Sequence, residues 1–205
     1  MGTPDREASV FVNCPFDARF KPLLDAIVFA AAACGMHVRS ALEVADSGEL
    51  RLQKIMRLLE GSRYSIHDIS RVEPDPETRL PRFNMPIELG AALGMKHLGR
   101  ARLRDHRMLV LDTDKYRYQK FASDLAGVDI SAHGDAPAKA IGAVRDFFAT
   151  HFPSPLPSPS LIEDGYTVFE SALPAMAKAA NQTEAELTFR DRLQLISLFN
   201  ARSSV

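Results

Sequence analysis

The chain has 205 residues, of which 46% are hydrophobic and 25% are charged, and its formal net charge is −1. This composition is typical of a folded domain with a core, and the balanced charge argues against bulk attraction to nucleic acid or to an anionic membrane. The two cysteines, Cys14 and Cys34, form neither a disulfide framework nor a zinc-ligand pattern. No apolar run approaches the roughly 20 residues that span a bilayer, and the N-terminal segment lacks a signal-peptide core. We therefore expect a cytoplasmic protein that does not associate with membranes and holds no metal.

Apolar and amphipathic segments alternate along the first three quarters of the chain. Strands are predicted at 9–15, 36–42, 64–70, 107–112 and, at an edge, 128–131; helices are predicted at 18–35, 48–62, 84–97, 115–127 and 136–152. Such alternation predicts an α/β fold of the flavodoxin- or Rossmann-like type, a three-layer sandwich around a parallel sheet of about five strands. Ligands of such sheets bind at the carboxyl ends of the strands.

The last quarter of the chain differs in composition. A Pro/Ser-rich linker at 153–162 separates the predicted α/β domain, 1–152, from a helical extension, 163–205. Thr183 and Glu186 have the spacing of a capping box, and the helix that follows has a broad apolar stripe. One or two shorter helices are expected around Pro174. The stripe has to be buried on the domain or a second subunit, and a partner-protein surface is the alternative.

Glu88 is the most unusual acidic residue in the sequence. The stretch "NMPIELGAALGMK" (84–96) predicts a helix start, which places Glu88 in the first turn among small and apolar neighbours. One interpretation is structural, because a carboxylate is favoured near a helix N-terminus. The other is chemical, because such a carboxylate can attack or stabilise an oxocarbenium-like sugar carbon. The pair Gly90 and Gly94 is expected to let this helix pack closely on the sheet.

Polar residues also follow the second and third predicted strands. Asp68 and Ser70 either close a turn or face a ligand, and Asp46 and Arg51 either begin a helix or contribute to the same site. A nucleophile pair of Cys14 and His67 is disfavoured, because both lie where burial makes such groups inert. Neither a G-x-G-x-x-G nor a G-x-x-x-x-G-K-[ST] motif is present, which disfavours a dinucleotide-dependent dehydrogenase and a P-loop NTPase.

The segment "KHLGRARLRDHR" (96–107) is the most basic part of the chain. Cations are favoured at the end of the preceding helix, so an exposed helix end and loop is one interpretation. The alternative is a phosphate or nucleic-acid contact through Arg100, Arg102 and Arg104. The absence of interleaved aromatic residues argues against binding of single-stranded nucleic acid.

Two of these segments, "VFVNCPFD" (10–17) and "NMPIELGAALGMK", resemble the nucleoside 2-deoxyribosyltransferase-like superfamily. Those enzymes carry a catalytic glutamate in a Glu-Leu-Gly-x-Ala helix start, and TIR-type NAD-cleaving domains use a glutamate on a similar architecture. The resemblance covers roughly residues 9–150. It implies that Glu88 is the catalytic carboxylate, that Phe16 stacks on the leaving base, and that Asp68 lies on the pocket floor. Asn13, Cys14 and Pro15 would contact the base from the same turn as Phe16.

The sequence departs from that family just before Glu88. An acidic residue of the transferases is replaced in a longer, more charged loop, where Arg82 and Asn84 stand instead. An arginine favours a phosphorylated ligand, so NAD or a nucleotide is expected as substrate rather than as cofactor. The resemblance implies cleavage or transfer at an N-glycosidic bond, as in bacterial anti-phage effectors held by a partner or an oligomer. The alternatives are a non-catalytic nucleotide-binding signalling module and a scaffold protein of a nucleic-acid complex.

Overall fold

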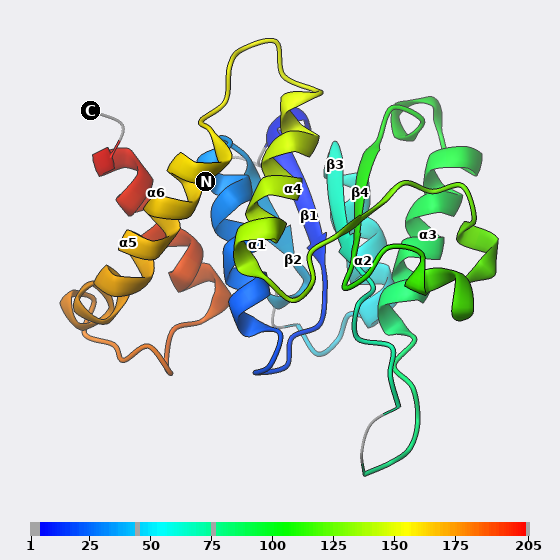
Figure 1. Cartoon of the computed structure of the whole chain (residues 1–205), viewed down its shortest axis with the longest axis horizontal. Coiled ribbons are helices and arrows are strands. Elements are labelled where there is room, and N and C mark those ends of the chain that lie inside the picture. Colours follow the sequence, from blue (N-terminus) through cyan, green and yellow to red (C-terminus); the bar gives the residue numbers. More distant parts are fainter. Residues whose placement is uncertain (1–4, 44–45, 75–76, 204–205) are drawn as a thin grey trace.

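A five-stranded parallel sheet lies at the centre of the computed structural model, which describes residues 5–43, 46–74 and 77–203 (Figure 1). The strands are β1 (Ser9–Asn13), β2 (His37–Ser40), β3 (Tyr64–Asp68), β4 (Arg107–Asp112) and β5 (Ile130–Ala132). Their order is β2-β1-β3-β4-β5, and each neighbouring pair is parallel. This arrangement confirms the predicted flavodoxin- or Rossmann-like α/β fold, including the short edge strand.

Helices cover both faces of the sheet. The α-helices are α1 (Lys21–Ala33), α2 (Arg51–Glu60), α3 (Asn84–Leu98), α4 (Pro137–Ala149), α5 (Pro159–Ala179) and α6 (Phe189–Ser203). Short 3₁₀ helices are η1 (Arg6–Ala8), η2 (Ala41–Glu43), η3 (Ala101–Leu103), η4 (Arg117–Lys120) and η5 (Ser123–Leu125). Helices α1 and α4 lie on one face, with α5 and α6 outside α1, and α2 and α3 lie on the other face (Figure 1).

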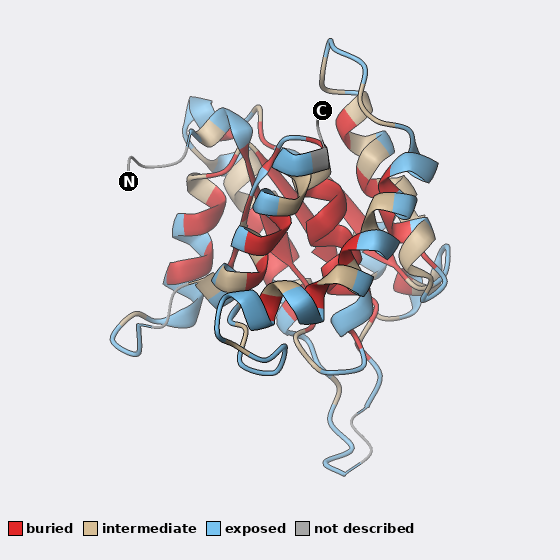
Figure 2. Ribbon diagram, turned by 90° about the vertical axis from the view of Figure 1, so that its left-hand side faces the viewer, coloured by how far each residue is buried: buried red, intermediate tan, exposed pale blue. Residues whose placement is uncertain are grey.

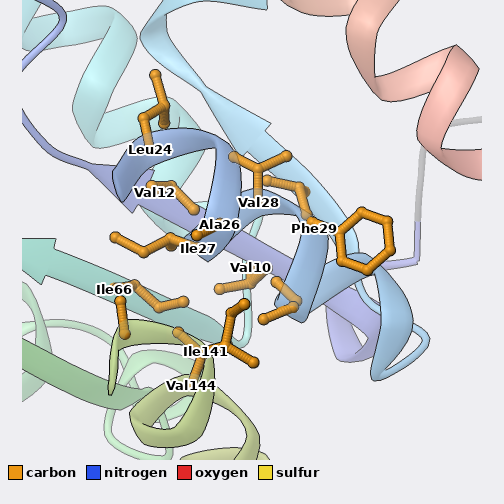
Figure 3. Close-up of a cluster of buried hydrophobic side chains, with 14 of the residues drawn as sticks. Val10, Val12, Leu24, Ala26, Ile27, Val28, Phe29, Ile66, Ile141 and Val144 are labelled. Atoms are coloured by element: carbon orange, nitrogen blue, oxygen red, sulfur yellow. The ribbon is translucent and has the colours of Figure 1, made fainter. Parts of the chain in front are cut away.

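The central strands are buried on both sides, which explains their nearly continuous apolar sequences. In β1, Val10 and Val12 join the larger core beneath α1 and α4 (Figure 3). Phe11 belongs instead to the cluster on the opposite face, beneath α2. Burial is concentrated along the inner faces of the helices, and their outer faces are exposed (Figure 2). The layer of α2 and α3 is the one that positions Glu88.

The C-terminal helices extend the same core. Phe169 and Leu173 of α5, with Ile196 of α6, are buried in the cluster that contains the sheet and α1. The ring of Phe169 lies 5.5 Å from the ring of Phe29 in α1. The apolar stripe of the predicted tail is therefore buried on the α/β domain itself. Within the described part of the chain, no helix is long and apolar enough to cross a membrane.

An ion-pair cluster also joins these helices to α1. Arg192 of α6 lies 2.8 Å from a carboxylate oxygen of Asp25 and 2.6 Å from one of Glu170. Lys21 approaches the same Asp25 oxygen at 2.6 Å. Arg192 and Asp25 are both buried, so their charges are compensated within this cluster rather than by water.

The predicted helix at 115–127 is wrong. This segment contains η4 and η5, two short 3₁₀ turns, instead of a continuous α-helix. Tyr116 has a left-handed backbone with φ of 65°, and Ala122 lies outside the helical region, so neither residue continues a helix. Phe121 and Leu125 pack against a small cluster beside β4, which favours this irregular path.

Two predicted details of the C-terminal region are also wrong. Helix α5 begins at Pro159, inside the predicted linker, and continues through Pro174 to Ala179. The buried face of α5 offsets the backbone hydrogen bond that this proline cannot donate. Helix α6 begins at Phe189 behind a capping box of Thr188 and Asp191, while Thr183 and Glu186 form a separate hydrogen-bonded turn.

The prediction that Gly90 and Gly94 pack against the sheet is wrong as well. A Cβ atom built on either glycine would meet nothing within 4 Å. Instead Met85, Leu89 and Ala92 form the buried side of α3. The two glycines therefore lie on a side of the helix that faces away from the core.

Candidate active site

The candidate site lies where the strand order reverses. The chain leaves β1 toward β2 on one side and later returns to place β3 on the other side of β1. Ligand sites of doubly wound sheets form outside the carboxyl ends of the strands at such a point. Here Asn13 ends β1 and Asp68 ends β3. The segment between β3 and α3 projects beyond this edge of the sheet (Figure 1), with Pro74 and Pro81 forming an antiparallel bridge.

Glu88 reaches this region from α3. It is the fifth residue of the helix, which begins at Asn84, so the predicted first-turn position is wrong by one residue. Its side chain is only 8% exposed, and one carboxylate oxygen lies 3.7 Å from Nε of Arg51. Burial raises the pKa of the Glu88 carboxyl, and Arg51 acts in the opposite direction. Because the dipole effect weakens beyond the first turn, Arg51 replaces the helix N-terminus as the main group favouring the charged form.

Two other predicted residues, Arg51 and Phe16, lie close to this carboxylate. Arg51, at the start of α2, pairs with Glu88 and also lies over the ring of Phe16, 5.8 Å from its centroid. Phe16 belongs to the turn after β1 and is half-buried. A carboxylate, a guanidinium and an aromatic ring, supplied by three elements, therefore occupy adjacent positions at the sheet edge. This set offers an anion contact, a flat apolar surface and a group able to face a sugar carbon.

The turn after β1 is held by Asn13. Its side-chain amide donates to Nδ1 of His67 at 3.1 Å and to the backbone carbonyl of Met85 at 3.3 Å. The second bond ties the end of β1 to the first turn of α3. Cys14 and Pro15 are buried beside it. Burial raises the pKa of the Cys14 thiol well above its ordinary value, with nearby carboxylates adding to the effect, so this thiol is chemically inert.

Asp68 and Ser70 form a closed turn. One Asp68 oxygen accepts from the Ser70 backbone N–H at 2.9 Å and from the Ser70 hydroxyl at 2.5 Å. The other lies 3.0 Å from Nε2 of His133, and the backbone N–H of Asp135 donates to Nδ1 of that ring. Asp68, Ser70 and His133 are all fully buried. This geometry agrees with the structural interpretation of Asp68, which holds the end of β3 against the loop after β5.

The remaining predicted residues lie at the surface. Arg82 pairs with Asp17 at 2.9 Å, which joins the projecting segment to the turn after β1. Asn84 is exposed as the first residue of α3. Asp46 accepts from the backbone N–H of Gly48 at 2.8 Å, so it shapes a turn, and the prediction that it caps the helix is wrong because α2 begins at Arg51.

A buried hydrogen-bond chain behind the site was not found from the sequence. Nε2 of His67 lies 2.9 Å from the Ser65 hydroxyl, which lies 2.8 Å from Nε2 of His106. Nδ1 of His106 lies 3.0 Å from the backbone carbonyl of Ser62. These hydrogen bonds lie on the α2–α3 side of β3 and continue from His67 through Asn13 to the first turn of α3. The hydrogen-bond chain therefore runs along β3 from the amino end of the strand to its carboxyl end.

The Ser62 carbonyl at one end determines which nitrogen of each histidine in this hydrogen-bond chain carries the proton. A carbonyl only accepts, so Nδ1 of His106 carries its proton, and the Ser65 hydroxyl donates to Nε2. That hydroxyl then accepts from Nε2–H of His67, whose Nδ1 accepts from Asn13. Burial lowers the pKa of His67 to about 3 and that of His106 to about 4, so both rings are neutral. The only sequence signal is the alternation of Ser65 and His67 on one face of β3.

Other polar groups line the carboxyl ends of β4 and β5. Asp112 accepts from Arg117 at 2.6 Å, and the same guanidinium donates to the backbone carbonyl of Ser70 at 2.7 Å. Burial raises the pKa of Asp112, and Arg117 opposes that shift. Across residues 5–43, 46–74 and 77–203, no group of three histidine, cysteine or acidic side chains is placed to hold a metal ion.

Only some of the basic side chains in the segment 96–107 are available to contact a ligand. Arg102 forms an ion pair with Glu60, and His106 is buried in the chain described above. Arg100 and Arg104 are exposed. The three predicted phosphate-contacting arginines therefore do not share one environment.

No protein-family model matches this chain, and no curated protein matches it. The functional interpretation accordingly depends on the geometry around Glu88.

Proposed function

We propose that the protein cleaves or transfers at the N-glycosidic bond of a nucleotide-type ligand, with Glu88 as the carboxylate that faces the anomeric carbon. The observation that carries this proposal is the placement of a nearly buried glutamate beside Arg51 and Phe16 at the reversal of strand order. Ligand sites of this fold class occur there, and an aromatic ring next to a cation suits a flat base attached to a phosphorylated sugar.

The chemistry follows from those three groups. The base stacks on Phe16, and Arg51 moves from the Glu88 carboxylate toward a phosphate oxygen, with which it forms a stronger charge-assisted contact. As the bond between base and sugar stretches, positive charge develops on the anomeric carbon. The Glu88 carboxylate stabilises that charge or captures the carbon, and water or another acceptor completes the reaction.

The hydrogen-bond chain behind the site supports the helix that carries the reacting carboxylate. Asn13 links the end of β1 to the Met85 carbonyl, one turn before Glu88. The neutral rings of His67 and His106 extend this link into the core. The supporting groups are buried and hydrogen-bonded, which is what holding a catalytic side chain within a narrow range requires.

A panel of ligands tests the proposal. The purified protein is incubated with NAD⁺, deoxynucleosides and their monophosphates, and the released base is separated by chromatography. Release from a phosphorylated ligand in preference to a deoxynucleoside is the expected result. Release from none of the compounds, under conditions in which the same compounds bind, contradicts catalysis.

A ligand-binding module is the second candidate. It is favoured by the Glu88–Arg51 pair itself, because a carboxylate that is 8% exposed and paired suits a hydroxyl contact as well as a reacting carbon. In this case Glu88 would accept hydrogen bonds from a ribose. Calorimetry that detects nucleotide binding, lost in Glu88→Gln, without any released base would identify this function.

A further inference from the structure

The outward face of α3 exposes apolar side chains that the fold does not cover. Leu98 is 90% exposed, Ile87 is 59% exposed, and Phe83, just before the helix, is 48% exposed. Between them lie Gly90 and Gly94, where an added Cβ would meet nothing within 4 Å. At 100° per residue all five positions fall on one side of the helix.

Neighbouring residues of α2 widen this face. Leu52 is 47% exposed and Met56 is 42% exposed. Both lie near the side of α2 that carries Leu59, which packs with Ala92 of α3. We call the combined surface the α3 face: Leu52, Met56, Phe83, Ile87, Gly90, Gly94 and Leu98.

The composition of the α3 face is unfavourable for a helix that meets only water. A helix with glycine at an exposed interior position is less stable than one with alanine there, and no atom of residues 5–43, 46–74 and 77–203 lies close enough to require glycine at positions 90 and 94. Large exposed apolar side chains grouped on one surface are characteristic of an interface. Both features become favourable if a second helix lies across the two glycines, because the absent side chains allow the helix axes to approach closely.

We propose that the α3 face is the contact surface between two copies of this chain, with α3 of one copy antiparallel to α3 of the other. The order of residues supports a second copy over an unrelated protein. Reading from either end, a large apolar residue is followed by a glycine, a second glycine and another large apolar residue: Ile87, Gly90, Gly94, Leu98. A two-fold axis that crosses the exposed side of α3 at the level of Ala92 along the helix places Ile87 of one copy against Leu98 of the other. The same axis brings the glycines of the two copies together. A self-complementary patch of this kind is what a two-fold dimer requires.

Area and charge agree with this assignment. The exposed parts of the α3 face amount to roughly 600 Å² per copy, near the lower limit of the areas buried in specific dimers. The seven residues of the α3 face carry no ionisable side chain, and the exposed His97 borders them on the helix, so two copies meet without burying like charges at the centre of the contact. The dimer is independent of the chemistry at Glu88, whose side chain is on the opposite, buried side of α3.

Sedimentation velocity over a concentration series tests the proposal. We expect the 205-residue protein to form a reversible dimer. Leu98→Glu and Gly94→Leu should each raise the dimer dissociation constant at least tenfold, the first by placing a charge in the interface and the second by separating the helices. Leu161→Glu is the matched control, because Leu161 is a similarly exposed apolar residue, 62% exposed, on α5.

Each outcome decides the matter. A dimer weakened by both α3 variants and unaffected by Leu161→Glu supports the proposal, provided that circular dichroism shows the variants to be folded. A Cβ atom built on Gly94 meets nothing within 4 Å in the described part of the chain, and circular dichroism checks that the rest of the leucine side chain leaves the fold intact. A wild-type protein that stays monomeric at the highest concentrations, or a dimer that both α3 variants leave unchanged, overturns the proposal.

Discussion

The buried histidines make the fold sensitive to mild acid. In the folded protein the pKa of His67 is about 3 and that of His106 is about 4, because burial disfavours the charged rings. In the unfolded chain both return to about 6.5. Between these values the unfolded state binds protons that the folded state does not. The stabilising contribution of the neutral rings is therefore complete above the unfolded pKa and is lost as the pH falls below 6.5.

The magnitude follows from the size of the shifts. At pH 5, which is about 1.5 units below the unfolded pKa, each ring lowers the free energy of unfolding by about 2 kcal/mol. The two rings together give about 4 kcal/mol, a large part of the 5–15 kcal/mol that stabilises a typical domain. Urea unfolding at intervals between pH 7 and pH 5 measures this loss as a slope of free energy against pH.

A variant isolates the contribution of one ring. Glu88 and Glu170, whose pKa values are raised by burial, titrate in the opposite sense and reduce the total slope. In His67→Gln that background remains, and the slope of the free energy of unfolding between pH 6 and pH 5 should fall by about 1 kcal/mol per pH unit. Ile55→Val, a core change without a titrating group, should lower stability equally at every pH. If His67→Gln left the slope of the free energy of unfolding against pH unchanged, His67 would not be a neutral, buried ring in the folded protein.

Three further predictions concern the core and the site. Phe169→Ala should lower the free energy of unfolding by about 3–5 kcal/mol in one cooperative urea transition, because α5 shares the core of the sheet; two separate transitions would contradict a shared core. Arg192→Met should cost about 1–3 kcal/mol, because it leaves the buried Asp25 with only the half-exposed Lys21 as a cationic partner, and adding Asp25→Asn should restore part of the loss; an unchanged urea midpoint would argue against the pair. Arg51→Gln should raise the pKa of Glu88 further, since Arg51 favours the charged carboxylate; a carbon-13 NMR titration of Glu88 that shows no upward shift would exclude that contact.

The sequence was sufficient to predict the parallel sheet, because buried parallel strands and amphipathic helices have distinct hydrophobic periodicities. It failed where local backbone geometry decides, as at Tyr116, whose left-handed conformation prevents the predicted helix at 115–127. It also failed where tertiary burial overrides a local signal, as at Pro174 in the middle of α5. The exposure of Gly90 and Gly94 was missed because a helical pattern does not show which small residues face the sheet.

The site was predicted in part. Glu88, Arg51 and Phe16 come together because Phe16 follows β1, Arg51 begins α2 and Glu88 lies near the start of α3, all at the same sheet edge, which topology rules predict. The partner of Asp68 was missed, since His133 follows β5 and is distant in the sequence. The same holds for the hydrogen-bond chain through Ser65, whose two histidine neighbours are recognisable only after β3 and β4 are placed side by side.

The most direct test of the central claim compares base release by the wild type with release by Glu88→Gln. Glutamine keeps the size of the side chain and removes its charge, so the fold should survive while the reacting carboxylate is lost. Glu163→Gln, which changes an exposed glutamate of α5, is the control. We expect base release by the wild type and the control and a loss of at least a hundredfold in Glu88→Gln. Equal rates in a folded Glu88→Gln protein would contradict the role of this residue.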